Sequence, residues 1–407
     1  MDFDSFYMMA KYLLFCSTYH PAPVTSVIDF NIKDMIEKAG DPRNIIFWNW
    51  TPGQKNLLDA DIPRVILTSY WSTGKTRIMF EKAKILAAQG KIVIFILDCN
   101  NSLHYSPILF HCHLMNEIEA SKLNITLLLS DGQYEMDIAN ATTSQSDVHV
   151  FIDEFTFIGE DSYKKIDSLV SILGPQNYLW IAVGRKIFGT DIIFDKWLKE
   201  KEEEGFLLPS FTCPLRNSKD IVDFDASYGK KILIKGWLDS TYSMPTAGWP
   251  SVKLKSPSNQ IHAPQPILME HDPTQSFNES ILKCCQLFPS STRILVIVML
   301  MPGQKVFGDI PKKIVKAVHK ARGHHPLVIN HREYALHEKQ KAMKDWLLNK
   351  DGENGQDMIA SFSSLGGFEW PSVLLITDNT QFNRFEEKNS IMRAMSRLIV
   401  LRSEATL

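Results

Sequence analysis

The sequence predicts an α/β protein with two domains, each built on a mostly parallel sheet. Apolar strand candidates recur at 64–68, 92–97, 125–129, 148–152 and 178–183. A second series follows at 293–300, 326–330, 357–361, 372–377 and 397–401. Segments with helical periodicity separate these strands, and such alternation predicts βαβ units whose parallel sheets are covered on both faces. A chain of 407 residues also exceeds what one hydrophobic core usually serves.

The expected domains follow from this arrangement. Residues 1–48 form an N-terminal segment of unknown role, 49–206 the first domain and 207–407 the second. Residues 235–275 are rich in proline, serine and glycine, which predicts an irregular excursion rather than an independent unit.

Composition excludes some classes of protein. Apolar residues make up 44% of the chain, yet no stretch approaches the roughly 20 apolar residues of a membrane span, so no membrane association is expected. Lys11 interrupts the apolar run near the N-terminus, which makes a poor signal peptide. The six cysteines lack C-x-x-C spacing and predict reduced thiols in an intracellular protein, cytoplasmic or nuclear. A net charge of −2 does not indicate a nucleic-acid partner.

A candidate phosphate-binding loop gives the main functional indication. The segment 69–76, SYWSTGKT, follows the apolar run 65–67 and precedes an amphipathic segment at 77–88. Such a loop directs backbone N–H groups at phosphates, while Lys75 reaches the β- and γ-phosphates and Thr76 coordinates Mg²⁺. A serine stands where the consensus has its first glycine. The residues expected around ATP are Ser69, Tyr70, Trp71, Ser72, Thr73, Gly74, Lys75, Thr76 and Arg77.

A second motif, which ends in acidic residues, strengthens this interpretation. The segment 149–154, HVFIDE, is an apolar strand candidate that ends in two carboxylates. Asp153 is expected to hold Mg²⁺, and Glu154 to polarise the water that attacks the γ-phosphate. Because only the first domain has a phosphate loop, the nucleotide is expected in the cleft between the two domains.

Four further motifs lie in order over 51–401: TPGQ at 51–54, LRNS at 215–218, SFSSLGGFEWPSV at 361–373 and MRAMSRLIVL at 392–401. These motifs resemble those of the superfamily 1 helicase ATPase core of the UvrD/Rep and Schlafen-helicase kind. The resemblance implies two RecA-like domains without the usual accessory insertions. It implies adenine recognition by Gln54, a γ-phosphate contact from Arg216, nucleotide contacts from Gly367 and Glu369, and an arginine finger at Arg393.

The chain also departs from the family. Phe155 and Thr156 follow the acidic pair where a glutamine is usual, and Arg185 follows Gly184 where the resemblance would have an aspartate. By resemblance, 98–102 and Phe362 are candidates for nucleic-acid contact, although Asn100 and Asn101 equally suit a turn. ATP binding is therefore better supported than turnover, and turnover better than strand separation.

We expect an ATPase of the helicase or translocase type that acts on single-stranded DNA or RNA. Two alternatives stay open: a nucleotide-gated switch that regulates a protein partner, and a degenerate scaffold that binds nucleotide without turnover. The basic stretch at 312–322 is better explained by a solvated helix face than by a binding surface.

Overall fold

The computed structural model describes rather more than half of the chain. The described residues are 52–69, 73–99, 108–141, 148–157, 159–186, 191–211, 220–224, 264–290, 292–299, 310–329, 346, 356–361, 365, 370–378, 391 and 393–403. The chain divides into two compact units, Met1–Ala60 and Asp61–Leu407. Of the first unit only helix α3 (Pro52–Asp59) and Ala60 are described.

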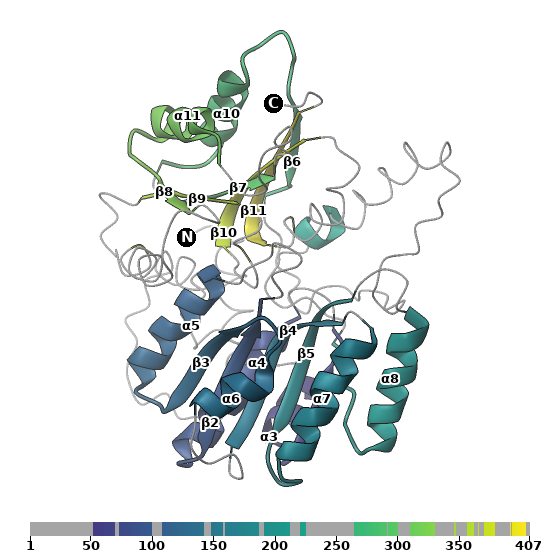
Figure 1. Ribbon diagram of the computed structural model, residues 1–407. Helices are drawn as coiled ribbons and strands as arrows, with labels where there is room; N and C mark the ends of the chain where they lie inside the picture. The colour runs from purple at the N-terminus through teal and green to yellow at the C-terminus, as the bar shows by residue number, and fades with distance from the viewer. Residues whose placement is uncertain are drawn as a thin grey trace. The chain divides into compact units, whose positions relative to one another are not determined.

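The first sheet of the larger unit has five parallel strands in the order β1-β5-β4-β2-β3 (Figure 1). The strands are β1 (Arg64–Leu67), β2 (Ile92–Asp98), β3 (Ile125–Ser130), β4 (Val148–Phe157) and β5 (Leu179–Lys186). The helices are α4 (Lys75–Ala88), α5 (Ile108–Ser121), α6 (Tyr134–Ala141), α7 (Glu160–Ile172) and α8 (Asp191–Glu203). Strands β1, β2 and β4 are almost wholly buried, which explains their near-continuous apolar sequence, whereas the edge strand β3 is half-buried.

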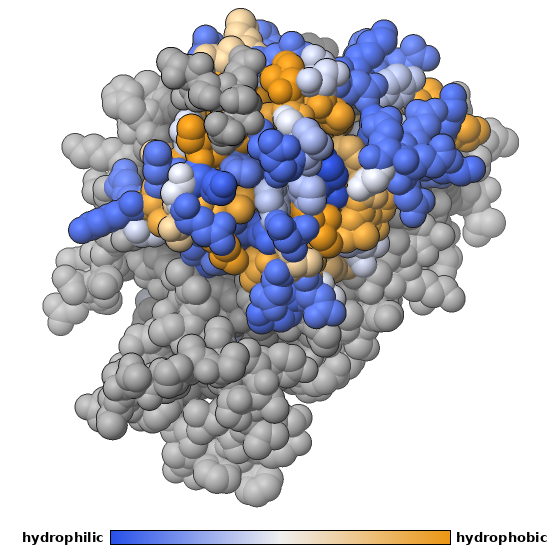
Figure 2. All heavy atoms as spheres, turned by 90° about the horizontal axis from the view of Figure 1, so that it is seen from below, coloured by the Kyte–Doolittle hydropathy of each residue, from blue (hydrophilic) through white to orange (hydrophobic). Residues whose placement is uncertain are grey.

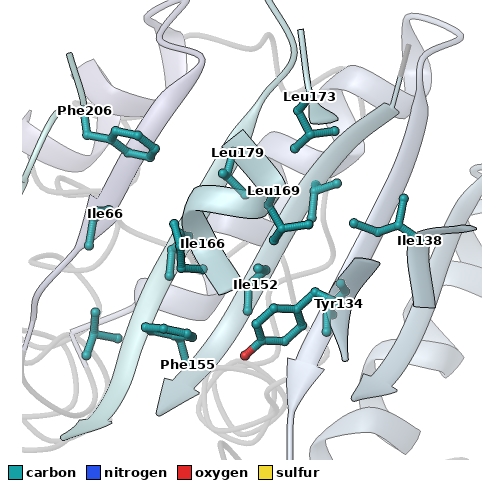
Figure 3. Close-up of a cluster of buried hydrophobic side chains, with 14 of the residues drawn as sticks. Ile66, Tyr134, Ile138, Ile152, Phe155, Ile166, Leu169, Leu173, Leu179 and Phe206 are labelled. Carbon is teal, nitrogen blue, oxygen red and sulfur yellow. The ribbon is translucent and has the colours of Figure 1, made fainter. Parts of the chain in front are cut away.

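Strand order decides which helices share a face. The chain moves across the sheet in one direction from β1 to β2 to β3 and then returns to β4 and β5. Because parallel crossovers are right-handed, the first two connecting helices cover one face and the next two the other. An ion pair between Arg77 and Glu117 joins α4 to α5 on the first face. On the second face, α6, α7 and α8 pack on a single apolar cluster with β1, β4 and β5 (Figure 3).

The second sheet has six parallel strands in the order β6-β11-β10-β7-β9-β8. They are β6 (Ile267–Glu270), β7 (Leu295–Met299), β8 (Leu327–Ile329), β9 (Met358–Ser361), β10 (Trp370–Asp378) and β11 (Ala394–Ser403). Helices α10 (Phe277–Gln286) and α11 (Lys312–Arg322) lie side by side and pack on this sheet through a second apolar cluster (Figure 1).

The predicted fold class is confirmed, because both sheets are parallel and alternate with helices. All ten predicted strands are present near their expected positions, and the basic stretch at 312–322 forms α11. Two details add to the predicted domain organisation. Strand β6 lies within the segment 235–275 that was predicted to be irregular, of which 235–263 is outside the described residues. Leu207, at the start of the predicted second domain, forms a parallel bridge with Val65 of β1.

The surface is mixed in polarity. Figure 2 shows hydrophilic side chains interspersed with hydrophobic ones over the coloured part of one face. No helix in the described segments combines the length and the apolar character that a membrane crossing requires.

A buried carboxylate anchors the second sheet. Asp357 is fully buried directly before β9. It accepts hydrogen bonds from the backbone N–H of Ile294 (2.8 Å) and from Nε of Arg322 (2.9 Å), and it lies 3.0 Å from Nε2 of His324. One side chain therefore holds together the beginning of β7, the end of α11 and the beginning of β9.

We expect Asp357→Ala to lower the free energy of unfolding by about 3–5 kcal/mol, since it leaves the buried guanidinium of Arg322 without its carboxylate. Urea unfolding followed by tryptophan fluorescence measures this difference. Asp195→Ala, which removes an exposed carboxylate on α8, is the control and should change stability by less than about 0.5 kcal/mol. Equal stability of the two variants would contradict the anchoring role.

Candidate nucleotide-binding site

The described residues just before α4 have features expected of a phosphate-binding loop. Gly74 caps α4 with φ 84° and ψ 18°, in the left-handed region that residues with a Cβ rarely adopt. Helix α4 begins directly after it with Lys75 and Thr76. The first N–H groups of a helix have no intrahelical partner, so this end of α4 is suited to an anion. Tyr70, Trp71 and Ser72 lie outside the described residues.

Lys75 reaches back across this loop. Its Nζ donates a hydrogen bond to the backbone oxygen of Ser69 at 2.7 Å. Thr73 is fully buried and Thr76 is half-buried. The ammonium group of Lys75 thus lies at the beginning of the loop, where the phosphate-binding interpretation requires it.

Ser69 has a structural role that explains its presence at a consensus glycine position. Its backbone φ is not positive, so no glycine is required there. Its Oγ accepts a hydrogen bond of 2.6 Å from the backbone N–H of Phe211. Beside it, Oγ of Ser210 donates to the oxygen of Thr68 at 2.6 Å, and the N–H of Thr68 donates to the oxygen of Pro209. The segment 207–211 is therefore attached along β1 and to the first residue of the loop.

Asp153 on β4 is the buried acid of the site. Its side chain is 1% exposed, and neither carboxylate oxygen has a hydrogen-bond partner among the described residues. Burial, together with the charge of Glu154, raises the pKa of this carboxyl to about 7. The Thr76 hydroxyl and the Lys75 ammonium approach closely enough to lower that pKa without completing a hydrogen bond. Asp153 is thus a buried carboxylate whose two oxygens are available as ligands next to the Thr76 hydroxyl. Such a pair of oxygen-bearing side chains fits a divalent cation.

Glu154 is held in an irregular part of β4. Its φ is +57°, and the pairing of β4 with β5 shifts register between Ile152 and Phe155. This β-bulge turns the Glu154 side chain out of the regular alternation of the strand. Its nearest neighbour on β5 is Gly184, where a Cβ would lie 2.6 Å from Cα of Glu154 and would also overlap its carboxylate. Glu154 as a whole residue is half-buried.

Arg77 lies on α4 next to the predicted magnesium ligand Thr76, and its guanidinium is engaged elsewhere. It forms ion pairs with Glu117 on α5 (2.7 Å) and with Glu81. Lys84 contacts the same two carboxylates, and the pKa of Glu117, although raised by burial, is lowered overall by Arg77 and Lys84. The cluster fixes α4 against α5, and a contact of Arg77 with nucleotide stays a prediction.

The remaining predicted site residues are placed as follows. Gln54 is fully buried on α3. Arg393 is 6% exposed and directly precedes β11, and its backbone oxygen accepts a hydrogen bond from the N–H of Trp370. Arg216, Gly367 and Glu369 lie outside the described residues. The structure thus brings together Lys75, Thr76, Asp153 and Glu154, with Ser69 and Gly74 in the same loop.

Sequence reasoning missed the role of Asp98. By resemblance it was a candidate for nucleic-acid contact, whereas the structure buries it to 4% exposure at the end of β2. Its Oδ2 accepts a hydrogen bond of 2.9 Å from the backbone N–H of Thr156 on β4. Burial raises its pKa to about 7, and Glu154 adds to that shift. A carboxylate at the end of an apolar strand was the available signal, because the carboxyl ends of parallel strands share one edge of a sheet.

Comparisons with known proteins give only distant likenesses. No known family model and no curated protein sequence matches the chain. Among solved structures, the Escherichia coli DEAH/RHA helicase HrpB is similar at 12% identity and a TM-score of 0.45, over 86% of this chain and 42% of that one. A DEAD box protein from Methanococcus jannaschii is similar at 11% identity and a TM-score of 0.41, over 94% of this chain and 93% of that one.

The Arterivirus nonstructural protein 10 helicase in complex with DNA is similar at 10% identity and a TM-score of 0.38, over 86% of this chain and 62% of that one. This chain thus spans under half the length of HrpB and about three fifths of the viral helicase. Because these likenesses are distant, the function is argued from the chain's own residues.

The attachment of 207–211 to the loop can be tested at one amide. In Ser69→Ala the N–H of Phe211 loses its acceptor, and we expect its hydrogen exchange to accelerate roughly fivefold, which corresponds to the ~1 kcal/mol of a typical hydrogen bond. Ser210→Ala is the matched control, because it removes only the neighbouring bond to Thr68 and should leave the Phe211 amide protected. Unchanged exchange in Ser69→Ala would show that the hydroxyl does not hold this segment.

The raised pKa of Asp153 predicts how stability depends on pH. The pKa is about 7 in the folded protein and 3.8 ordinarily, so folding takes up a proton between these values. The contribution of Asp153 to the free energy of unfolding therefore falls as the pH rises from about 4 to about 7, and is constant above. Asp153→Asn should stabilise the nucleotide-free protein increasingly over that window, by more than about 1 kcal/mol at pH 8.

Urea unfolding at a series of pH values, without nucleotide or Mg²⁺, measures this difference. Asp195→Asn, at an exposed position, should show no such trend. A stability gain for Asp153→Asn that does not change with pH would mean that the buried carboxyl is not the titrating group.

Proposed function

We propose that this chain binds ATP with Mg²⁺ at the phosphate loop and hydrolyses ATP, as a superfamily 1-like ATPase of the helicase or translocase type. The observation that carries the proposal is the position of Asp153. It is a buried carboxylate without a hydrogen-bond partner among the described residues, close enough to Lys75 and Thr76 for both to lower its pKa. A loop that resembles a phosphate site by chance would not need an acid buried against it.

The binding roles follow from the chemistry of each group. Lys75 would exchange its bond to the Ser69 oxygen for the β- and γ-phosphate oxygens, since phosphate is a stronger acceptor than a carbonyl. The N–H groups at the beginning of α4 would contact phosphate oxygens. Thr76 and Asp153 would hold Mg²⁺, whose charge offsets the charge that develops on the γ-phosphate.

Glu154 is the proposed general base. It is half-buried next to Asp153, and its carboxylate would accept the proton of the attacking water. The proposal retains Arg216 and Arg393 as the residues that offset transition-state charge from the second domain, and Gln54, Gly367 and Glu369 as nucleotide contacts. These assignments rest on the motif resemblance. Single-stranded DNA or RNA is the proposed effector.

A nucleotide-gated switch that acts on a protein partner is the second candidate. It is favoured by the net charge of −2 and by the bond between Ser69 and Phe211, which attaches the loop directly to a neighbouring segment. ATPase rates with and without single-stranded DNA or RNA distinguish the two candidates. Stimulation by a nucleic acid supports the helicase or translocase type, and ATP turnover that no nucleic acid changes supports the switch.

The proposed site predicts a different defect for each of three variants. Lys75→Ala should abolish tight ATP binding, because it removes the charge between the β- and γ-phosphates. Glu154→Gln should retain affinity for ATP with Mg²⁺ and lose turnover, since an amide cannot accept the proton. Arg393→Ala should also retain most affinity and lose turnover, by ~10³-fold if it acts on the transition state. Calorimetry gives the affinities, and single-turnover hydrolysis gives the rates.

Lys91→Ala and Glu202→Gln remove matched groups from exposed positions and should behave as the wild type. Wild-type affinity in Lys75→Ala would disprove the phosphate loop. Wild-type turnover in Glu154→Gln would exclude Glu154 as the base, and in Arg393→Ala it would remove the second domain's arginine from the chemistry.

A further inference from the structure

The Asp98 side chain, at the end of β2, accepts a hydrogen bond from the backbone of β4 close to Glu154. At Glu154 the strand is irregular. The ladder between β2 and β4 ends at Leu97 and Asp153. Beyond it β4 continues to Phe157, and β5 is its only partner among the strands that the structure describes. The backbone N–H of Thr156 would have no ladder acceptor on the β2 side, and the Asp98 carboxylate accepts its hydrogen bond there, in a buried environment.

The backbone at Glu154 needs such support. A non-glycine residue with φ +57° is less stable than one in a right-handed or extended conformation by roughly 1–2 kcal/mol. Such a conformation persists only when the surrounding structure enforces it. The bond from Thr156 to Asp98 fixes the chain two residues after Glu154. The pairing of Phe155 with Val183 fixes the intervening residue on the other side.

Gly184 supplies the space that the bulge occupies. A Cβ at this position would lie 2.6 Å from Cα of Glu154 and 2.9 Å from its carbonyl carbon, which are distances that real Cβ atoms do not show. The atoms that would collide include backbone, which cannot move aside as a flexible side chain can. Any larger residue at 184 would therefore displace Glu154 itself.

The position of Asp98 is itself determined by packing. It is 4% exposed, and the hydroxyl of Tyr134 on α6 interacts with its carboxylate. The ring of Tyr134 lies 6.4 Å from that of Phe155, the residue after Glu154, and both belong to the apolar cluster on this face (Figure 3). Tyr134 on α6 therefore helps to fix the position of Asp98, and the Asp98 carboxylate in turn fixes β4 through Thr156.

We propose that Asp98 and Gly184 are positioning residues for Glu154: Asp98 holds the bulge of β4 by accepting the Thr156 hydrogen bond, and Gly184 leaves the space into which Glu154 turns. The inference rests on the proposed function, because it assigns both residues to the orientation of the proposed general base. A base must lie within hydrogen-bond reach of the water that it deprotonates, so a shift of ~1 Å can lower the rate roughly 100-fold.

The test compares Asp98→Ala and Gly184→Ala in the wild-type and Glu154→Ala backgrounds. In the wild-type background we expect each to lower single-turnover ATP hydrolysis by ~10-fold or more, with affinity for ATP and Mg²⁺ changed less than about twofold. In the Glu154→Ala background each should change the residual rate by less than about twofold, because its effect acts through the missing carboxylate. Asp98→Asn retains an oxygen acceptor for Thr156 and should recover most of the activity lost in Asp98→Ala.

Several results would overturn the inference. Equal losses in both backgrounds would mean that Asp98 and Gly184 act independently of Glu154. A parallel loss of affinity would mean that the substitutions disrupt the phosphate site as a whole. If Glu154→Gln lowers turnover while Asp98→Ala and Gly184→Ala hydrolyse ATP as the wild type does, only the positioning role is wrong. Wild-type turnover in Glu154→Gln would overturn the proposed base and the positioning role together.

Discussion

The burial of one carboxylate against the proposed phosphate-binding loop is the constraint on which the rest of the candidate site depends. Asp153 lies in the first sheet with 1% of its side chain exposed, and its pKa is raised to about 7 because solvation is lost. An ionised group in that environment is unfavourable unless opposite charge or a metal ion compensates it. The nearby Lys75 and Thr76 provide part of that compensation. In the proposed function a bound divalent cation would provide more of it.

Parallel strand topology explains why these groups meet. In a parallel sheet all strands end at the same edge, so residues that follow different strands gather there. The loop after β1, Asp98 at the end of β2 and the acidic pair on β4 share this edge. Strand β5 lies between β1 and β4 and brings Gly184 beside Glu154. The carboxylate of Glu154 thus depends on a residue 30 positions later in the chain.

The positions at which the chain departs from the helicase motifs that it resembles have different structural roles. Ser69 replaces a consensus glycine without strain, because its φ is not positive and its hydroxyl accepts the Phe211 hydrogen bond. Phe155 and Thr156 stand where a glutamine is usual, and here Phe155 packs in the apolar cluster while the N–H of Thr156 bonds to Asp98. These two positions therefore contribute to the shape of the bulge rather than to polar contacts in the site.

The sequence alone determined the fold class and the approximate position of every predicted strand, and it marked the loop at 69–76 and the acidic pair at 153–154 as candidates. These properties are local, because apolar runs, helical periodicity and a GKT motif are set by neighbouring residues. Only the tertiary structure decided that Ser69 holds Phe211, that Arg77 pairs with Glu117 and that Asp98 supports Glu154. Each of these contacts joins residues from 40 to 142 positions apart. Strand order and register create them, and no local pattern in one sequence encodes which strands become neighbours.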